Sequence, residues 1–476
     1  DVVLVASRVQ AGKNGVVQSE GGATILAAGE RVALTGRGLE GIRMEVKAGN
    51  EARNLGTLKG DAVGIFARTL RHSGHIEASA LGSAGGKVVL KATGGDAYVD
   101  GKIVARSGDR GGKIDVFGER VALESGALLQ ANGRQGGGQV RVGGDYQGAT
   151  AGVPNAKRLY MDAKARIEPG AIAKGKGGRV ILWSDEVTRM SGTISARGGA
   201  QGGDGGFVEV SGKDRLEFAG LVDLRAPKGK KGQLLLDPTD ITIVHQAPTS
   251  TLAPTTNTSE GPHPSDPDGT MFEPDSTTPA TISDRILNTQ LGYGDVIVKT
   301  SSTADNSGTG GQITVNTDAV ISWNSNSSLT LDADKGITMG GTISTTGTGG
   351  VHFKARNGNV DMATGSSVTA ARLKLEALAG DVVFDTLSLN PVGMGAAGGT
   401  LEILASGNVT GNRIQANGGN GDGSGAGGGA GGKGGTVDVK FGGDPQGAEV
   451  QADGGTGASG DSIPGGNGGD GGMGGI

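Results

Sequence analysis

Four carboxylates that fall close together in this sequence are the residues best suited to catalysis: Asp185, Glu186, Glu209 and Asp214. Two Asp or Glu side chains on one face can act as general acid and as nucleophile or base in polysaccharide cleavage. Residues this far apart in sequence meet only if a repeated strand architecture stacks them on one face. Outward positions on a solvated strand must be polar in any case, so we favour a non-enzymatic chain and predict no catalytic residue.

The histidines and the absence of cysteine argue against a metal centre. His72 and His75 could form a small metal pair, but no third or fourth ligand lies nearby in the sequence. We therefore expect both to be exposed turn residues. His245, His263 and His352 are isolated, and no clear Ser-His-Asp arrangement supports a hydrolase. The sequence predicts no metal ligand among these residues.

Glycine-rich loops offer weaker signals for phosphate or calcium binding. GRGLEG from Gly36 matches the dinucleotide fingerprint but joins two strand-like stretches, and GAGGKGGT lacks Ser or Thr directly after Lys433. Both matches are attributed to chance, and we predict no cofactor. Loops with Asp and Asn (Asn420 to Asp422, Asp461, and Asn467 to Asp470) leave calcium open, although none completes the calcium nonapeptide.

The charge distribution points to no nucleic-acid partner. The formal net charge is −5 and both signs are spread along the chain, so no basic footprint is present. Lys228, Lys230 and Lys231 form a small basic turn that could touch acidic glycans, although such a cluster is more often a solvated corner. No run of about 18 apolar residues suggests a membrane span. The chain starts at Asp1 without a visible signal peptide, so we expect a mature product or a fragment of a longer polypeptide.

The elements that must position these side chains are short strands separated by glycine. The chain has 96 glycines in 476 residues, with 35% hydrophobic and only 3% aromatic residues. The glycines keep no three-residue period, which excludes collagen, and Val, Ile and Leu occur in short alternating groups. A narrow core of aliphatic side chains fits this composition better than a broad core of Phe and Trp.

Internal repeats decide the fold class. One strand type follows glycine: GGKVVL, GGKIDV, GGQVRV, GGRVIL, GGFVEV and GQLLL. The first residues of these strands that we expect to point inward are at positions 88, 114, 140, 180, 208 and 234. Their spacings are 26, 26, 40, 28 and 26 residues. A second type reads GHIEA, GKIVA, GTISA and GLVDL, and a third reads RVAL, RLYM, RLEF and ITIV. The hexapeptide GERVAL occurs twice, from Gly29 and from Gly118, as further self-similarity. About three short strands per coil, with glycine at the corners, predict an all-β parallel β-helix, a solenoid.

Proline divides the predicted solenoid into two stacks. We predict a first β-helical stack over residues 1–246, a Pro-, Thr- and Ser-rich linker or excursion over 247–281, and a second stack with Gly-rich loops over 282–476. The linker holds seven of the 14 prolines, which cannot join a strand ladder. The second stack opens with ISDRILNTQL, which suggests one short helix over an open coil end, with Ser283 or Asp284 as its N-cap.

The stretch from Ile181 to Val244, ending in GQLLLDPTDITIV, resembles the conserved block of filamentous-haemagglutinin-like exoproteins, the large adhesins of two-partner secretion in Gram-negative bacteria. TISDRILNTQL and GQITVNTDAVISWNSNSSLTLDADKGI are similar to the block that follows in that family, so the resemblance spans roughly residues 170–360. It implies a right-handed β-helix, export through a partner outer-membrane transporter, a secreted or cell-surface location, and a role in adhesion, aggregation or biofilm formation. The secretion domain of that family carries NPNL and NPNG motifs, which are missing here, so we place the chain in the shaft.

The leading interpretation is therefore an extracellular fibre segment whose partners are host or bacterial surface glycans or proteins. Repeated weak contacts are useful in such a fibre because multivalency raises the overall affinity. A second interpretation is a self-assembling filament subunit, because an open β-helix end can accept another copy end to end. A polysaccharide-processing enzyme on the same scaffold is a third, which clustered carboxylates in a groove on one face would favour.

Overall fold

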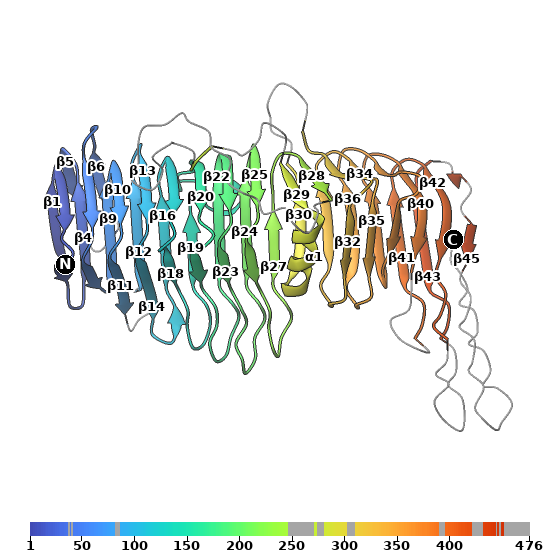
Figure 1. Cartoon of the computed structure of the whole chain (residues 1–476), viewed down its shortest axis with the longest axis horizontal. Helices are drawn as coiled ribbons and strands as arrows, with labels where there is room; N and C mark the ends of the chain where they lie inside the picture. Colours follow the sequence, from blue (N-terminus) through green and yellow to red (C-terminus); the bar gives the residue numbers. More distant parts are fainter. Residues whose placement is uncertain are drawn as a thin grey trace. The chain divides into compact units, whose positions relative to one another are not determined.

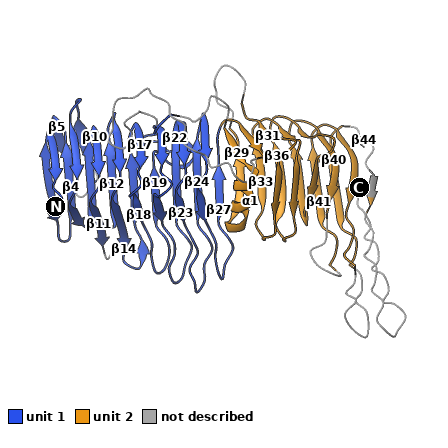
Figure 2. Cartoon of the chain, in the orientation of Figure 1, with its two compact units in different colours: residues 1–238, 251–278 blue, residues 239–250, 279–476 orange. Residues whose placement is uncertain are grey.

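The computed structural model describes residues 1–36, 39, 41–80, 86–245, 271–273, 280–301, 310–389, 396–420, 432–443, 445–446 and 449–451. The chain forms two compact units (Figure 2): unit 1 contains residues 1–238 and 251–278, and unit 2 contains residues 239–250 and 279–476. Of the predicted linker, only residues 271–273 and 280–281 are among those described, so its extent stays a prediction. None of the helices in these described ranges reaches the length and hydropathy of a membrane span.

Unit 1 is built from coils of three strands, and each strand pairs in parallel with its equivalents in the neighbouring coils (Figure 1). Its first face contains β1 (Val2–Ala6), β4 (Ala23–Ala28), β9 (Ala62–Ala67), β12 (Lys87–Ala92), β16 (Lys113–Phe117), β19 (Gln139–Val142), β22 (Arg179–Met190), β24 (Phe207–Gly212) and β27 (Gln233–Leu236). Its second face contains β2 (Arg8–Ala11), β7 (Glu51–Asn54), β10 (Thr69–His72), β13 (Asp96–Val99), β17 (Arg120–Leu123), β20 (Ala156–Met161), the second half of β22, and β25 (Arg215–Phe218). Its third face contains β3 (Val16–Gln18), β8 (Thr57–Gly60), β11 (His75–Ala80), β14 (Lys102–Ser107), β18 (Leu128–Gln130), β21 (Arg166–Glu168), β23 (Thr193–Ser195) and β26 (Leu221–Asp223).

Four short elements of unit 1 lie outside these ladders. They are β15 (Arg110–Gly111), which pairs antiparallel with β14, the hairpin strands β5 (Arg31–Leu34) and β6 (Ile42–Glu45), and the 3-10 turn η1 (Tyr146–Gly148). The usual step between equivalent positions is 26 residues, as from Asp115 to Arg141. The predicted parallel β-helix with three strands per coil is confirmed.

The core of unit 1 contains a column of aliphatic side chains from the first face. Its members are in register from coil to coil, and each is at most 1% exposed: Val88, Ile114, Val140, Val180, Val208 and Leu234. The repeat lengthens between the third and fourth members because a loop at residues 143–155 lies on the outer surface, and the register is unchanged. The column predicted from spacing is therefore confirmed at every position.

Close approach between coils explains why glycine occupies the corners. Gly203 has a φ of +115°, and a Cβ atom there would lie 2.1 Å from the carbonyl oxygen of Gly175 in the preceding coil. Any other residue would combine an unfavourable backbone conformation with a steric clash.

The two copies of GERVAL adopt different structures. The copy from Gly118 forms β17, whose Val121 and Leu123 point into the core. The copy from Gly29 forms β5, which pairs with β6 outside the parallel ladders. Val32 and Met44 of this hairpin pack against outward side chains of β4 and β9, among them Phe66. The shared hexapeptide therefore does not mark the same repeat strand, because neighbouring surfaces rather than the hexapeptide decide which side is buried.

Unit 2 repeats the three-strand coil with shorter turns, and its regular step is 22 residues, as from Ser328 to Gly350. Its first face contains β30 (Asp295–Lys299), β33 (Leu329–Ala333), β36 (Gly350–Ala355), β39 (Arg372–Ala377), β41 (Thr400–Ala405) and β43 (Thr436–Phe441). Its second face contains β28 (Ile241–Val244), β31 (Ile313–Val315), β34 (Ile337–Met339), β37 (Val360–Met362), β40 (Val382–Ser388) and β42 (Val409–Gln415). The remaining elements are β29 (Thr281–Ser283), helix α1 (Asp284–Tyr293), β32 (Val320–Trp323), β35 (Thr342–Thr345), β38 (Ser367–Thr369), β44 (Pro445–Gln446) and β45 (Glu449–Gln451).

Helix α1 covers the edge of β32 within unit 2. Its N-cap is Ser283, whose hydroxyl accepts a hydrogen bond from the backbone N–H of Arg285, so the predicted helix and cap are confirmed. Asn288 Nδ2 donates to the carbonyl oxygen of Val320 at 3.1 Å, and the N–H of Ser322 donates to Asn288 Oδ1 at 2.7 Å. One side-chain amide thus replaces the hydrogen bonds of a neighbouring strand and protects an open edge.

Removal of a core aromatic from unit 2 should be costly. Phe353 on β36 is fully buried, so Phe353→Ala should lower the free energy of unfolding by about 3–5 kcal/mol, through lost transfer energy and a residual cavity. Urea unfolding followed by far-ultraviolet circular dichroism measures the loss. The matched control is Lys354→Ala, at the adjacent outward position, which should change stability by about 0.5 kcal/mol or less. Equal effects of the two substitutions would contradict the inward and outward assignment of β36.

Candidate functional site

The structure does not gather the four carboxylates of the sequence analysis into one site. Asp185 accepts a hydrogen bond from Trp183 Nε1 at 3.0 Å, and Glu186 forms an ion pair with an arginine at 2.9 Å. Asp214 is exposed, whereas Glu209 is fully buried. The four side chains therefore lie in separate environments.

The outer-surface loop at residues 143–155 covers Glu209. Among the described residues, Gln147 of this loop is the one non-glycine residue with a positive φ, of 53°. Its backbone N–H donates to Glu209 Oε1 at 3.0 Å, and its side-chain Nε2 donates to Asp237 Oδ2 at 2.6 Å. The hydroxyl of Ser211 donates to Glu209 at 3.1 Å. The loop thus seals a buried polar network against the first face of unit 1.

Burial raises the pKa of Glu209 to about 7, against the hydrogen bonds from Gln147 and Ser211 that favour its charged form, and the nearby carboxylate of Asp237 raises it further. A carboxyl group that titrates near neutrality suits acid–base catalysis. Here, however, the loop contacts both carboxylate oxygens. This arrangement makes Glu209 a pH-sensitive structural contact.

His72 is a buried strand residue, so the expectation that it is an exposed turn residue was wrong. It ends β10 and is 0% exposed, with Nδ1 3.1 Å from Asn54 Nδ2 and Nε2 3.3 Å from the carbonyl oxygen of Lys102. Burial lowers its pKa to about 4, so the ring is neutral and hydrogen-bonded in the core. His75 starts β11 and is half-buried, with Nε2 3.9 Å from Glu77, so it too lies in a strand rather than a turn.

In the part of the chain that the structure describes, no group of three or more His, Asp or Glu side chains could hold a metal ion. His245 and His352 are not isolated in space: they contact Asp284 at 2.9 Å and Glu376 at 2.8 Å. The hydrogen bond that His245 donates to the carboxylate of Asp284 raises the pKa of His245. The candidate residues His263, Asp422, Asp461 and Asn467–Asp470 lie outside the described residues.

The other loop motifs occupy simple structural positions. Lys228 and Lys230 are exposed in the turn after β26, where Asp204 accepts a hydrogen bond from the backbone N–H of Lys230 at 2.8 Å. The GRGLEG motif connects β5 and β6 of the antiparallel hairpin, as expected of a loop between two strands. Lys433 lies shortly before β43.

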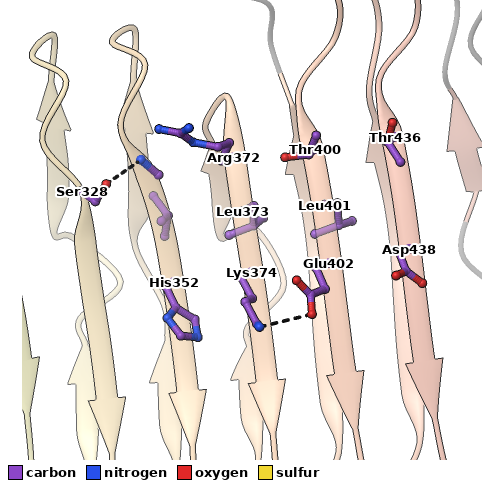
Figure 3. A pocket seen from close by; sticks show the side chains of 12 residues that line it. Ser328, His352, Arg372, Leu373, Lys374, Thr400, Leu401, Glu402, Thr436 and Asp438 are labelled. Atoms are coloured by element: carbon purple, nitrogen blue, oxygen red, sulfur yellow. Dashed lines mark hydrogen bonds and ion pairs between the residues drawn. The ribbon is translucent and has the colours of Figure 1, made fainter.

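A shallow groove of about 430 Å³ crosses the outer side of the first face of unit 2, from β33 to β43 (Figure 3). Its polar lining follows from the register of the strands. One row of outward side chains, one from each successive coil, is His352, Lys374, Glu402 and Asp438. The neighbouring row on three of the same strands is Arg372, Thr400 and Thr436.

Ion pairs fix the side chains at the centre of the groove. Lys374 Nζ lies 2.9 Å from Glu376 and 3.2 Å from Glu402, and His352 Nε2 lies 2.8 Å from Glu376. Burial opposes the ionisation of Glu376, but the hydrogen bonds from Lys374 and His352 outweigh it and lower the pKa of that carboxyl. The groove therefore carries a lysine between carboxylates in a fixed order, with Glu376 and Glu402 as the two partners of Lys374.

This groove is better suited to binding than to cleavage. Glu402 and Asp438 are on adjacent strands, which lie about 4.8 Å apart, close to the separation of about 5–5.5 Å between the carboxyl groups of retaining glycosidases. Acid catalysis needs one carboxyl group in an environment that raises its pKa. Glu402 instead pairs with Lys374, and Asp438 pairs with Lys440 at 2.8 Å. Two ion-paired carboxylates offer hydrogen-bond acceptors to a polar ligand.

Sequence reasoning missed the groove, although the signal was present. The alternation of apolar and polar residues marks four strands in the second stack, GVHFKA, LKLEA, TLEIL and TVDVK, but it does not by itself assign their register. Aligning the strands on their first inward residues, Val351, Leu373, Leu401 and Val437, places the row of His, Lys, Glu and Asp at the next position of each.

The parallel ladders define the chain as a parallel β-helix. No family model matches it, and no curated protein matches it. Among solved structures, the chain is similar to the HMW1 secretion domain from Haemophilus influenzae, with 30% sequence identity and a TM-score of 0.42. The similarity covers 48% of this chain and 62% of that chain, so less than two thirds of that chain is spanned. That structure is a secretion domain, whereas the sequence analysis placed this chain in the shaft, and the placement stays a prediction.

Glu209→Gln should remove a pH dependence of stability from unit 1. The pKa of Glu209 is raised from 4.5 to about 7 in the folded chain, so its stabilising contribution is fully present below the unfolded pKa and is lost as the pH rises through about 7. The neutral amide does not titrate. The wild type should therefore lose up to about 3 kcal/mol relative to the variant between pH 4 and pH 8.

Urea unfolding at several pH values over that range measures this difference. Glu186→Gln, which alters a partly exposed carboxylate of β22 that is ion-paired with Arg158 of the second face, is the control and should show no comparable trend. A difference between the wild type and Glu209→Gln that does not vary with pH would contradict the assignment.

Proposed function

We propose that this chain is a segment of an exported bacterial surface fibre, whose β-helical units present their outer faces for attachment to glycans or proteins of other cells. The observation that carries the proposal is the groove of unit 2, where strand register sets charged and hydroxyl side chains in rows across successive coils. Hydrogen-bonding groups at a constant spacing of about 4.8 Å suit an extended polar ligand better than a small substrate.

The pairing of charges within the groove favours attachment over catalysis. Lys374 holds Glu402 and Glu376 in place, so the surface that a ligand meets is already ordered. An ordered surface loses less conformational entropy on binding, which increases affinity for each contact. Repetition of such contacts along a fibre would add avidity.

Two features of the sequence support export. Residues 170–360 resemble exoproteins that cross the outer membrane through a dedicated transporter. The chain contains no cysteine, so it needs no disulfide to become stable. Its stability comes instead from backbone ladders and aliphatic packing, which form after the chain emerges.

Disrupting the groove should weaken attachment. Beads coated with the double variant Lys374→Ala, Glu402→Ala should bind bacterial or epithelial cell surfaces at least about tenfold more weakly than beads coated with the wild type, because two fixed polar contacts are lost. A bead-adhesion assay, repeated against immobilised surface glycans, measures the effect.

The matched control is Lys102→Ala, which removes an exposed lysine from β14 of unit 1 and should leave attachment unchanged. Unchanged attachment of the double variant would show that another surface makes the contact. Failure of the wild type to attach to any of these surfaces would contradict the proposed function itself.

A further inference from the structure

The tripeptide Met-Phe-Glu at residues 271–273 docks on the second face of unit 1. Although it comes from the proline-rich stretch, its methionine and phenylalanine are only 8% and 4% exposed. Both pack with Tyr98 and Ala122, and the half-buried Tyr160 packs against the same cluster. Burial of this degree on an outward face requires a surface shaped to receive it.

The register of three strands builds that surface. Tyr98 on β13, Ala122 on β17 and Tyr160 on β20 occupy one outward row, one residue per coil. The small side chain of Ala122 leaves a notch between the two tyrosines. The ring of Phe272 enters it, with its centroid 6.3 Å from that of Tyr98 and an interplanar angle of 59°. Tilted aromatic pairs at this distance attract each other.

Three arginines around the notch complete the recognition of the tripeptide. The guanidinium of Arg120 lies 5.3 Å from the phenylalanine ring centroid and is held by two hydrogen bonds to Asp96, at 2.9 and 2.7 Å. Arg158 forms an ion pair with the tripeptide's glutamate, and Arg189 Nη1 donates to the methionine carbonyl oxygen at 3.4 Å. A cation over a ring and a cation beside a carboxylate together select an aromatic residue followed by an acidic one.

We propose that this notch, formed by Tyr98, Ala122 and Tyr160 with the three arginines, is a peptide-binding site, and that the tripeptide of a second copy can replace the one bound in cis. Every receptor side chain belongs to strands of unit 1, whereas residues 271–273 belong to no strand. The tripeptide can therefore leave and return without breaking a ladder.

A second copy is the occupant that the chemistry favours, because each chain carries both the notch and the segment that fits it. Exchange of identical segments preserves every contact. Whether the notch binds its own tripeptide or that of a second copy therefore depends on the protein concentration relative to the effective concentration of the tethered segment. Such exchange would join chains through strand faces and is independent of pairing at coil ends. It is also independent of the groove in unit 2 and of the attachment function proposed for it.

Peptide binding tests the site directly. The probe is a fluorescent peptide of the sequence PDGTMFEPDST, which corresponds to residues 267–277. It should bind the variant Met271→Ala, Phe272→Ala at least about tenfold more tightly than the wild type, whose notch is already occupied in cis. Fluorescence anisotropy measures both affinities. The matched control peptide, with alanine in place of phenylalanine, should not bind, and equal binding of the two peptides would overturn the site.

Charge reversal separates recognition from a folding defect. Arg158→Glu, combined with Met271→Ala and Phe272→Ala, should weaken binding of the probe peptide. A peptide with arginine in place of its glutamate should restore binding to this variant. Circular dichroism confirms that each protein variant is folded. Loss of binding without rescue would show that Arg158 supports the fold and does not bind the glutamate of the peptide.

Complementation tests the exchange between copies. Ala122→Arg fills the notch but leaves the tripeptide available, whereas Met271→Ala, Phe272→Ala leaves the notch open. A mixture of the two variants should form a heterodimer in analytical ultracentrifugation, and neither variant alone should dimerise through this contact. No heterodimer at concentrations above the dissociation constant of the probe would restrict the site to the cis segment and overturn the second-copy proposal.

Discussion

Parallel backbone hydrogen bonding in constant register is the constraint on which the other features of this protein depend. Because side chains alternate between the two sides of a strand, a shift of one residue would turn the column from Val88 to Leu234 outward. The buried column therefore fixes every outward position as well. The groove row in unit 2 and the aromatic row around Ala122 are both consequences of that register.

Departures from the regular coil are placed on the outer faces, where they do not disturb the ladders. The hairpin of β5 and β6, the loop at residues 143–155 and the tripeptide at residues 271–273 each cover outward side chains that would otherwise meet water. Two of the covered patches contain aromatic residues unusual for a solvated strand, Phe66 and Tyr98, and the third buries the carboxyl group of Glu209. The outer surface thus combines solvated rows with a few closed patches.

Sequence reasoning reached the features that depend on local periodicity. Strand alternation and glycine spacing located the core column and the three strands per coil, and the helix pattern narrowed the N-cap to Ser283 or Asp284, of which the structure has Ser283. It failed where the outcome depends on contacts between coils. The hexapeptide GERVAL carries no information on which surface covers it, and His72 looked exposed because its partner Asn54 lies one coil away. The groove row was missed for the same reason, since its members are separated by whole coils.

The side-chain amide of Asn288 has a consequence for how unit 2 can fold. A parallel ladder is slow to start, because its first pairing must close a long loop before any bond forms. Helix α1 instead needs only contacts that are local in sequence, and its Asn288 offers a donor and an acceptor to β32. Folding can therefore nucleate at the helix, and later coils can add to β32 one after another. Such a nucleus would give the folding of unit 2 a direction, from the helix toward β43.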